Sequence, residues 1–137
     1  MPANDILVNK AAIVERCIRR LREEYTANPE LDCPTHTDAL LLNMERACQA
    51  VIDAAMHIIA TRHLGAPQNS ADAFRLLRQA GVLQQHTAQR MQAMVGFRNI
   101  AIHQYQDLDI TVIRQIAVDG WQDFCRFFQE LGINLHP

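Results

Sequence analysis

The stretch that decides the fold is residues 43–67, NMERACQAVIDAAMHIIATRHLGAP. Its apolar residues recur every three or four positions, which is the spacing of one face of an α-helix and not the alternation of a β-strand. This face comprises Leu41, Met44, Cys48, Val51, Ile52, Ala55, Ile58 and Ile59. The stretch therefore predicts a long helix that is buried along one side.

The same helical spacing continues in both directions along the chain. It predicts helices at about residues 5–26, 35–64, 70–81, 84–102 and 107–131. Thr35 or Thr37 can cap the second helix, and Asp107 or Asp109 the fifth. Long helices joined by short turns pack as an antiparallel bundle. We therefore expect an all-α antiparallel bundle of about five helices, forming a single domain over residues 1–137.

Composition limits the classes of function. The chain has 137 residues, of which 49% are hydrophobic, and its 13 Lys and Arg against 15 Asp and Glu give a net charge of −2. Sequence-indifferent binding of nucleic acid needs a basic excess, so any such contact must come from a local patch. No apolar run approaches the roughly 20 residues of a membrane span. The first residues lack a signal-peptide pattern and the four cysteines form no CxxC pair, so we expect a soluble cytoplasmic protein.

A polar cluster interrupts the fourth predicted helix at residues 96–105, GFRNIAIHQY. Arg98, Asn99, His103 and Tyr105 crowd into eight positions that otherwise read as apolar helix. Arginine and histidine also favour helix C-termini, where they meet the free carbonyl groups. On a straight helix, Arg98 and His103 lie about 140° apart. Either the helix breaks near Ile102, or two copies of the chain share a cleft.

The residue types in this cluster suit the cleavage of RNA. His103 can gain or lose a proton near neutral pH, and Arg98 carries a permanent planar charge suited to a phosphate. RNA supplies its own nucleophile, the 2′-hydroxyl, so one general acid or base and one charge stabiliser suffice. No cage of carboxylates accompanies the cluster, so metal-dependent phosphoryl transfer is not favoured.

The string MVGFRNIAIHQY resembles the R-x4-H-x-Y signature of HepT toxins in the HEPN superfamily. Three further segments look like helices of that family, in the same order: LVNKAAIVERCIRRLREE, NMERACQAVIDAAMHIIATRHLGAP and AFRLLRQAGVL. The matching segments extend from about Leu7 to Asp109. The extended string around Arg98 is far more specific than the bare R-x4-H spacing.

The resemblance implies a function and a set of site residues. HEPN ribonucleases are helical bundles that dimerise, place the arginine and histidine in a cleft between protomers, and cleave RNA without a metal or other cofactor. Arg98 and His103 would be the catalytic pair here, supported by Asn99. HepT toxins pair with MntA, a nucleotidyltransferase antitoxin that transfers AMP from ATP to the motif tyrosine, here Tyr105. The homodimer would act alone or join the antitoxin in a larger hetero-oligomer.

The sequence also allows other interpretations of the function and of the site residues. The chain can instead be a non-catalytic HEPN module that binds a nucleotidyltransferase partner or nucleotides. Asp53 and His57 lie four positions apart on one helix face, but two ligands fall short of a metal site. Arg16 and Arg20, in ERCIRRLREE, can contact RNA phosphates, although internal Glu–Arg pairs on a solvated face explain that segment more simply.

Overall fold

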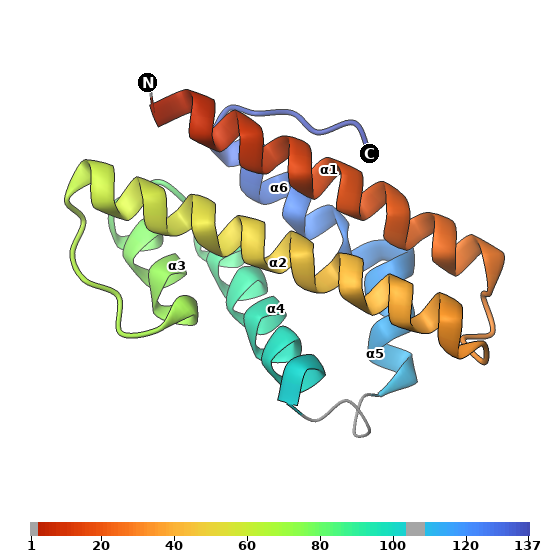
Figure 1. The fold of residues 1–137 in the computed structure, drawn as a ribbon. Helices are drawn as coiled ribbons and strands as arrows, with labels where there is room; N and C mark the ends of the chain where they lie inside the picture. Colours follow the sequence, from red (N-terminus) through yellow and green to blue (C-terminus); the bar gives the residue numbers. More distant parts are fainter. Residues whose placement is uncertain (1–2, 104–108) are drawn as a thin grey trace.

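The computed structural model describes residues 3–103 and 109–137, and within them it contains six α-helices, one π-helical turn and no strand (Figure 1). The all-α prediction is confirmed. The elements are α1 (Ala3–Ala27), α2 (Pro34–Arg62), α3 (Ser70–Gln79), α4 (Gln85–His103), α5 (Ile110–Gln115), η2 (Ile116–Gly120) and α6 (Gln122–Glu130).

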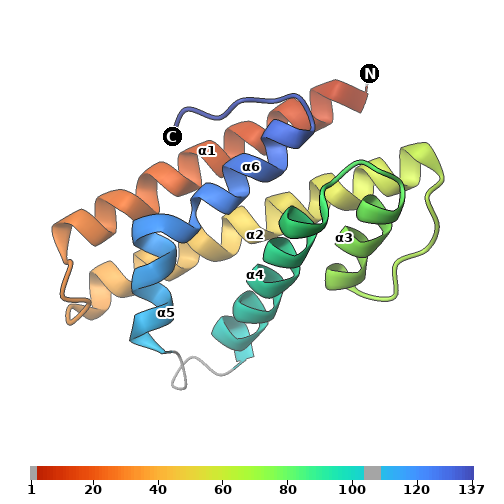
Figure 2. The same ribbon diagram turned by 180° about the vertical axis from the view of Figure 1, so that it is seen from behind.

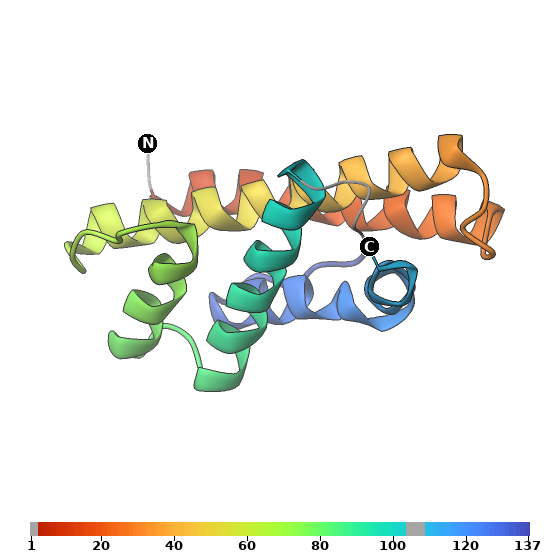
Figure 3. The same cartoon turned by 90° about the horizontal axis from the view of Figure 1, so that it is seen from below.

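The two longest helices, α1 and α2, lie side by side and antiparallel, and they form one layer of the molecule (Figures 1 and 3). Seen from behind, α6 runs along this pair, whereas α4 crosses it at a steep angle (Figure 2). Val14, Ile18 and Leu21 give α1 a fully buried stripe at the helical spacing expected from the sequence.

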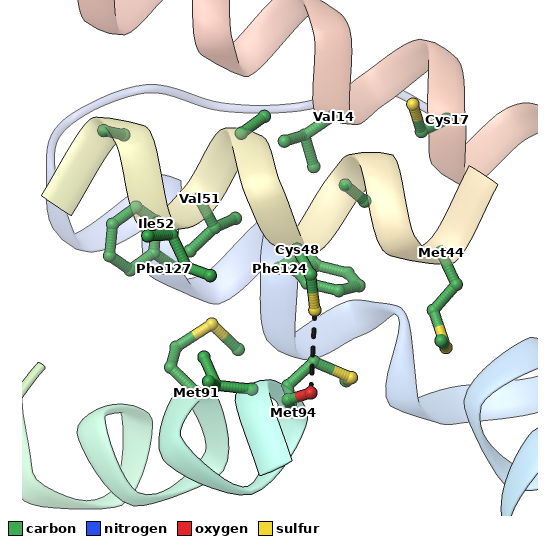
Figure 4. Packing of buried hydrophobic residues seen from close by; sticks show 14 of the residues in the cluster. Val14, Cys17, Met44, Cys48, Val51, Ile52, Met91, Met94, Phe124 and Phe127 are labelled. Carbon is green, nitrogen blue, oxygen red and sulfur yellow. Dashed lines mark hydrogen bonds between the residues drawn. The ribbon is translucent and has the colours of Figure 1, made fainter. Parts of the chain in front are cut away.

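The core lies between this layer and the remaining helices (Figure 4). Phe127 of α6 packs edge-on against Phe74 of α3, with ring centroids 5.9 Å apart, and against Phe128 at 5.1 Å. Met91 of α4 points toward α2 (Figure 4), and both Met91 and Met94 are buried. The core therefore joins helices that are distant in sequence.

Polar contacts from α6 hold the N-terminal half of α4. The carboxylate of Glu130 accepts a hydrogen bond from the backbone N–H of Gln84 at 2.8 Å and a second from the Thr87 hydroxyl. Arg90 Nε donates to Asp123 Oδ2 at 2.9 Å. A carboxylate at a helix N-terminus satisfies free N–H groups and meets the positive end of the helix dipole.

The predicted N-cap of the second helix was wrong, although the ends of the helix lie within two residues of those expected. α2 begins at Pro34, its N-cap residue is Cys33, which makes no side-chain capping bond, and neither Thr35 nor Thr37 is the N-cap. Proline suits the first helical turn because its missing N–H has no partner there in any case. At the other end, the C-cap residue His63 adopts the left-handed conformation, with φ 54°.

The predicted fifth helix is divided into α5, η2 and α6. Asp109 caps α5 by accepting a hydrogen bond from the N–H of Thr111 at 2.8 Å, whereas Asp107 lies outside the described residues. In η2, the Trp121 N–H bonds to the Ile116 carbonyl, five residues back, which marks a π-helical turn. This wider turn changes the phase of the apolar face. Ile110, expected to face inward, is 50% exposed.

Among the described residues, which are all but 1–2 and 104–108, no helix has the length and apolar character required to cross a membrane.

Removing the central aromatic contact tests this core. Phe127→Ala should lower the free energy of unfolding by about 3–5 kcal/mol, because it leaves a cavity among fully buried rings. Val118→Ala is the control: that side chain is 55% exposed, and its loss should cost less than about 0.5 kcal/mol. Urea unfolding followed by circular dichroism measures both values. Equal effects of the two variants would contradict this description of the core.

Candidate functional site

The candidate site lies at the C-terminal end of α4, where the helix runs beside α2. Met94, Val95 and Ala101 are buried on the core side of α4. Arg98 is half-buried and Asn99 is exposed, so both lie away from the fully buried side of the helix. α4 therefore anchors the site in the core through its buried side and carries the polar side chains of Arg98 and Asn99 on its other side.

A hydrogen bond to α2 fixes the position of this part of α4 relative to α2. The Cys48 thiol donates a hydrogen bond to the Met94 carbonyl, with 3.7 Å between sulfur and oxygen (Figure 4). Burial raises the pKa of Cys48 to about 12, and the nearby positive charge of Arg98 opposes that increase in part. Cys48 is thus a protonated core residue, and the Arg98 guanidinium lies close enough to act on it electrostatically.

The Arg98 guanidinium forms no ion pair with the residues that the structure describes. Its Nη1 lies 3.4 Å from Oδ1 of Asn99, which is a long hydrogen bond. Among residues 3–103 and 109–137, no carboxylate lies within 4 Å of it. An arginine without an ion pair retains its full capacity to bind a phosphate in a bidentate manner. Within the described residues, Arg98 therefore contacts only its neighbour Asn99 by a polar group.

Two arrangements were expected for Arg98 and His103: a break in the helix near Ile102, or a cleft shared by two copies of the chain. α4 remains helical through His103, so the helix does not break near Ile102. The two backbone positions are five residues apart and therefore about 140° apart around the helix axis. The side chain of His103 and the whole of Tyr105 lie outside the described residues.

Gly96 lies in α4, two residues before Arg98. A Cβ atom built at Gly96 meets nothing within 4 Å, so no other part of the described chain packs against it.

Asp53 and His57 have different surroundings in the structure. The Asp53 carboxylate accepts hydrogen bonds from Gln49, at 2.8 Å, and from Lys10, at 3.5 Å. His57 Nε2 is buried, and in the part of the chain that the structure describes it has no hydrogen-bond partner. Within the same residues, no three His, Cys, Asp or Glu side chains gather as ligands would.

Two arginines of α1 form the internal Glu–Arg pairs that explain this segment most simply. Arg20 binds Glu23 at 2.6 Å and Glu24 at 2.8 Å, and Arg19 lies 3.5 Å from Glu15. Arg16, in contrast, has no ion pair among the described residues. Sequence reasoning did not link Arg16 with any residue of α2, because the pairing of two helices along their length leaves no signal in a single sequence.

The raised pKa of Cys48 gives a chemical prediction. At pH 8 a thiol with a pKa near 12 is ionised in about one molecule in ten thousand, and the thiolate is the reactive form. Iodoacetamide should therefore leave Cys48 unmodified in the folded protein while it labels the half-buried Cys33. Peptide mass spectrometry reads both sites, and labelling in guanidinium chloride is the control. Labelling of the two cysteines at equal rates in the folded protein would contradict the packing of α4 on α2.

Three comparisons relate this chain to known proteins. A family model described as "Ribonuclease HepT-like" matches residues 13–131, a range that includes Arg98, His103 and Tyr105. The mRNA nuclease HepT of Shewanella oneidensis is 38% identical over 125 residues, which are 90% of this chain and 94% of that protein.

Solved structures agree with the sequence matches. A crystal structure of a toxin–antitoxin with AMP-PNP superimposes with a TM-score of 0.89 at 36% identity, over 93% of this chain and 98% of that one. The tri-AMPylated HEPN toxin of Shewanella oneidensis in complex with the MNT antitoxin gives a TM-score of 0.89 at 36% identity, over 96% and 98% of the two chains.

Proposed function

The chain belongs to the ribonuclease HepT-like family, and from this membership we propose that it is an endoribonuclease toxin of a toxin–antitoxin pair. The observation that carries the proposal is the match over 90% of the chain to a protein named mRNA nuclease HepT. The substrate is RNA. Because RNA and ATP are both cytoplasmic, we also propose that the toxin acts in the cytoplasm, and that residues 1–137 form one domain.

In the proposed reaction, the 2′-hydroxyl of RNA attacks the adjacent phosphorus atom and the 5′-oxygen leaves. One proton must leave the 2′-oxygen and another must reach the 5′-oxygen. His103 carries out one of these transfers. Arg98 stabilises the extra negative charge on the pentacovalent phosphate, and Asn99, in contact with the Arg98 guanidinium, helps to position it. The reaction requires no cofactor, since the substrate supplies the nucleophile.

A homodimer follows from the geometry of α4. One straight helix cannot direct residues about 140° apart at a single phosphate. A second copy of the chain can supply the missing half, because a twofold axis brings the Arg98 side of one helix to the His103 side of the other. We therefore propose that the active cleft lies between two protomers.

Substitution of the proposed catalytic pair tests this function. Arg98→Ala and His103→Ala should each reduce RNA cleavage at least about 100-fold, because each removes transition-state stabilisation or proton transfer. Arg78→Ala is the matched control, since Arg78 is exposed on α3 and distant from the motif in sequence. Cleavage of a labelled RNA by purified protein is the measurement, and circular dichroism verifies folding. Parental activity in folded His103→Ala would refute the assignment and favour a non-catalytic binding module.

Regulation is proposed from the complexes of the relatives. The Shewanella toxin is tri-AMPylated and bound to an MNT antitoxin. We propose that this chain likewise pairs with a nucleotidyltransferase antitoxin, and that Tyr105 accepts the AMP. A nucleotide two residues from His103 would bring phosphate charge to the site, where it would repel RNA and bind Arg98 in its place.

Intact mass tests the acceptor. Co-expression with the cognate nucleotidyltransferase should add the mass of one or more AMP units to the toxin and abolish its cleavage of RNA. Tyr105→Phe should remain unmodified and active in the same experiment, because phenylalanine lacks the accepting hydroxyl. Growth inhibition by the Tyr105→Phe toxin in the presence of the antitoxin gives a second readout. AMP found on Tyr105→Phe protein would exclude Tyr105 as the sole acceptor.

A further inference from the structure

A groove of about 680 Å³ runs between α1 and α2 on their outer side, and we refer to it as the α1–α2 groove. Its charged lining consists of Lys10, Arg16 and Arg20 from α1 and Arg46 and Asp53 from α2. Four cations therefore face one carboxylate, in a chain whose net charge is −2. The lining of the groove is therefore basic, although the chain as a whole is slightly acidic.

Two of the four cations are already neutralised. Arg20 binds Glu23 and Glu24, and Lys10 lies 3.5 Å from Asp53. Arg16 and Arg46 remain, both exposed and without an ion pair in the part of the chain that the structure describes. The unpaired charge of the groove is thus concentrated in two guanidinium groups, one from each wall.

These two guanidinium groups belong to residues that line one groove from its two walls, Arg16 from α1 and Arg46 from α2. The Cys17 thiol, which also lines the groove and is 4% exposed, has its pKa raised by burial, and the positive charges of Arg16 and Arg46 oppose that increase in part. A phosphate bound in the groove would form charge-assisted hydrogen bonds with these guanidinium groups.

The surroundings favour a polynucleotide over a free anion. The groove follows the two helices and is open along its length, and Leu42, 44% exposed, offers an apolar surface to a sugar or base. The groove and the contact with α4 involve the same stretch of α2, since Arg46 lines the groove and Cys48, two positions along the chain, contacts the Met94 carbonyl of α4.

We propose that Arg16 and Arg46 form a second phosphate-binding site in the α1–α2 groove, which holds the RNA backbone a few nucleotides from the bond that is cut. The inference rests on the proposed function, since it takes RNA as the substrate.

The test measures binding separately from cleavage. The probe is a fluorescent single-stranded oligonucleotide with 2′-O-methyl riboses, which lacks the nucleophilic hydroxyl and cannot be cut. Arg16→Gln/Arg46→Gln is compared with Arg62→Gln/Arg78→Gln, which removes the same charge from exposed arginines that do not line the groove. Fluorescence anisotropy gives Kd over a range of salt concentrations, and KM is measured for a cleavable RNA of the same length.

The groove variant should bind the probe at least tenfold more weakly than the control variant at low salt. The slope of log Kd against log salt concentration should fall by about 0.7, because one neutralised phosphate on a single strand contributes about 0.7. KM for the cleavable RNA should rise by a similar factor.

Equal Kd and equal salt slopes in the two double variants would overturn the inference. Unchanged RNA binding combined with lost binding of the nucleotidyltransferase would also overturn it, since the groove would then serve an acidic protein surface. The proposed function fails by a different result, in which the parental protein binds the probe but cuts no RNA. In that case the comparison of the two double variants still tests the groove.

Discussion

The proposed active site depends on one constraint: α4 is a continuous helix as far as His103. Glu130 fixes the N-terminus of α4, and the hydrogen bond from Cys48 to the Met94 carbonyl fixes its middle. The helix is therefore held at two points along its length. A rigid helix places Arg98 and His103 on different sides. Chemistry that requires both groups at one phosphate would therefore require two copies of the helix, which is why we propose that dimerisation is part of the catalytic mechanism.

Charge is distributed in a way that fits this view. A chain with net charge −2 cannot attract RNA over its whole surface. Some of its arginines are neutralised locally, as Arg20 is by two glutamates and Arg90 is by Asp123. Arg98 at the motif and Arg16 and Arg46 in the α1–α2 groove are among those that form no ion pair with the described residues. Arg16 and Arg46 differ from the other unpaired arginines in that they line one groove together.

Helical periodicity predicted the positions of the helices well, because a buried stripe repeats in the sequence whatever the helix packs against. It did not predict the π-helical turn at Ile116–Gly120, since that turn depends on how α5 and α6 pack together. Arg98 and Asn99 were identified from the motif, and the structure brings them together. The sequence did not predict that Arg16 and Arg46 line one groove, because this depends on how α1 is aligned along α2 in the folded chain.

Mixed dimers test the shared cleft most directly. Arg98→Ala and His103→Ala subunits, each inactive alone, are combined by co-refolding, and native mass spectrometry verifies that mixed dimers form. If each site takes its arginine from one protomer and its histidine from the other, the mixed dimer contains one intact site. RNA cleavage should then return to a substantial fraction of the parental rate. Mixed dimers that form but remain as inactive as their parents would contradict a site built across two chains.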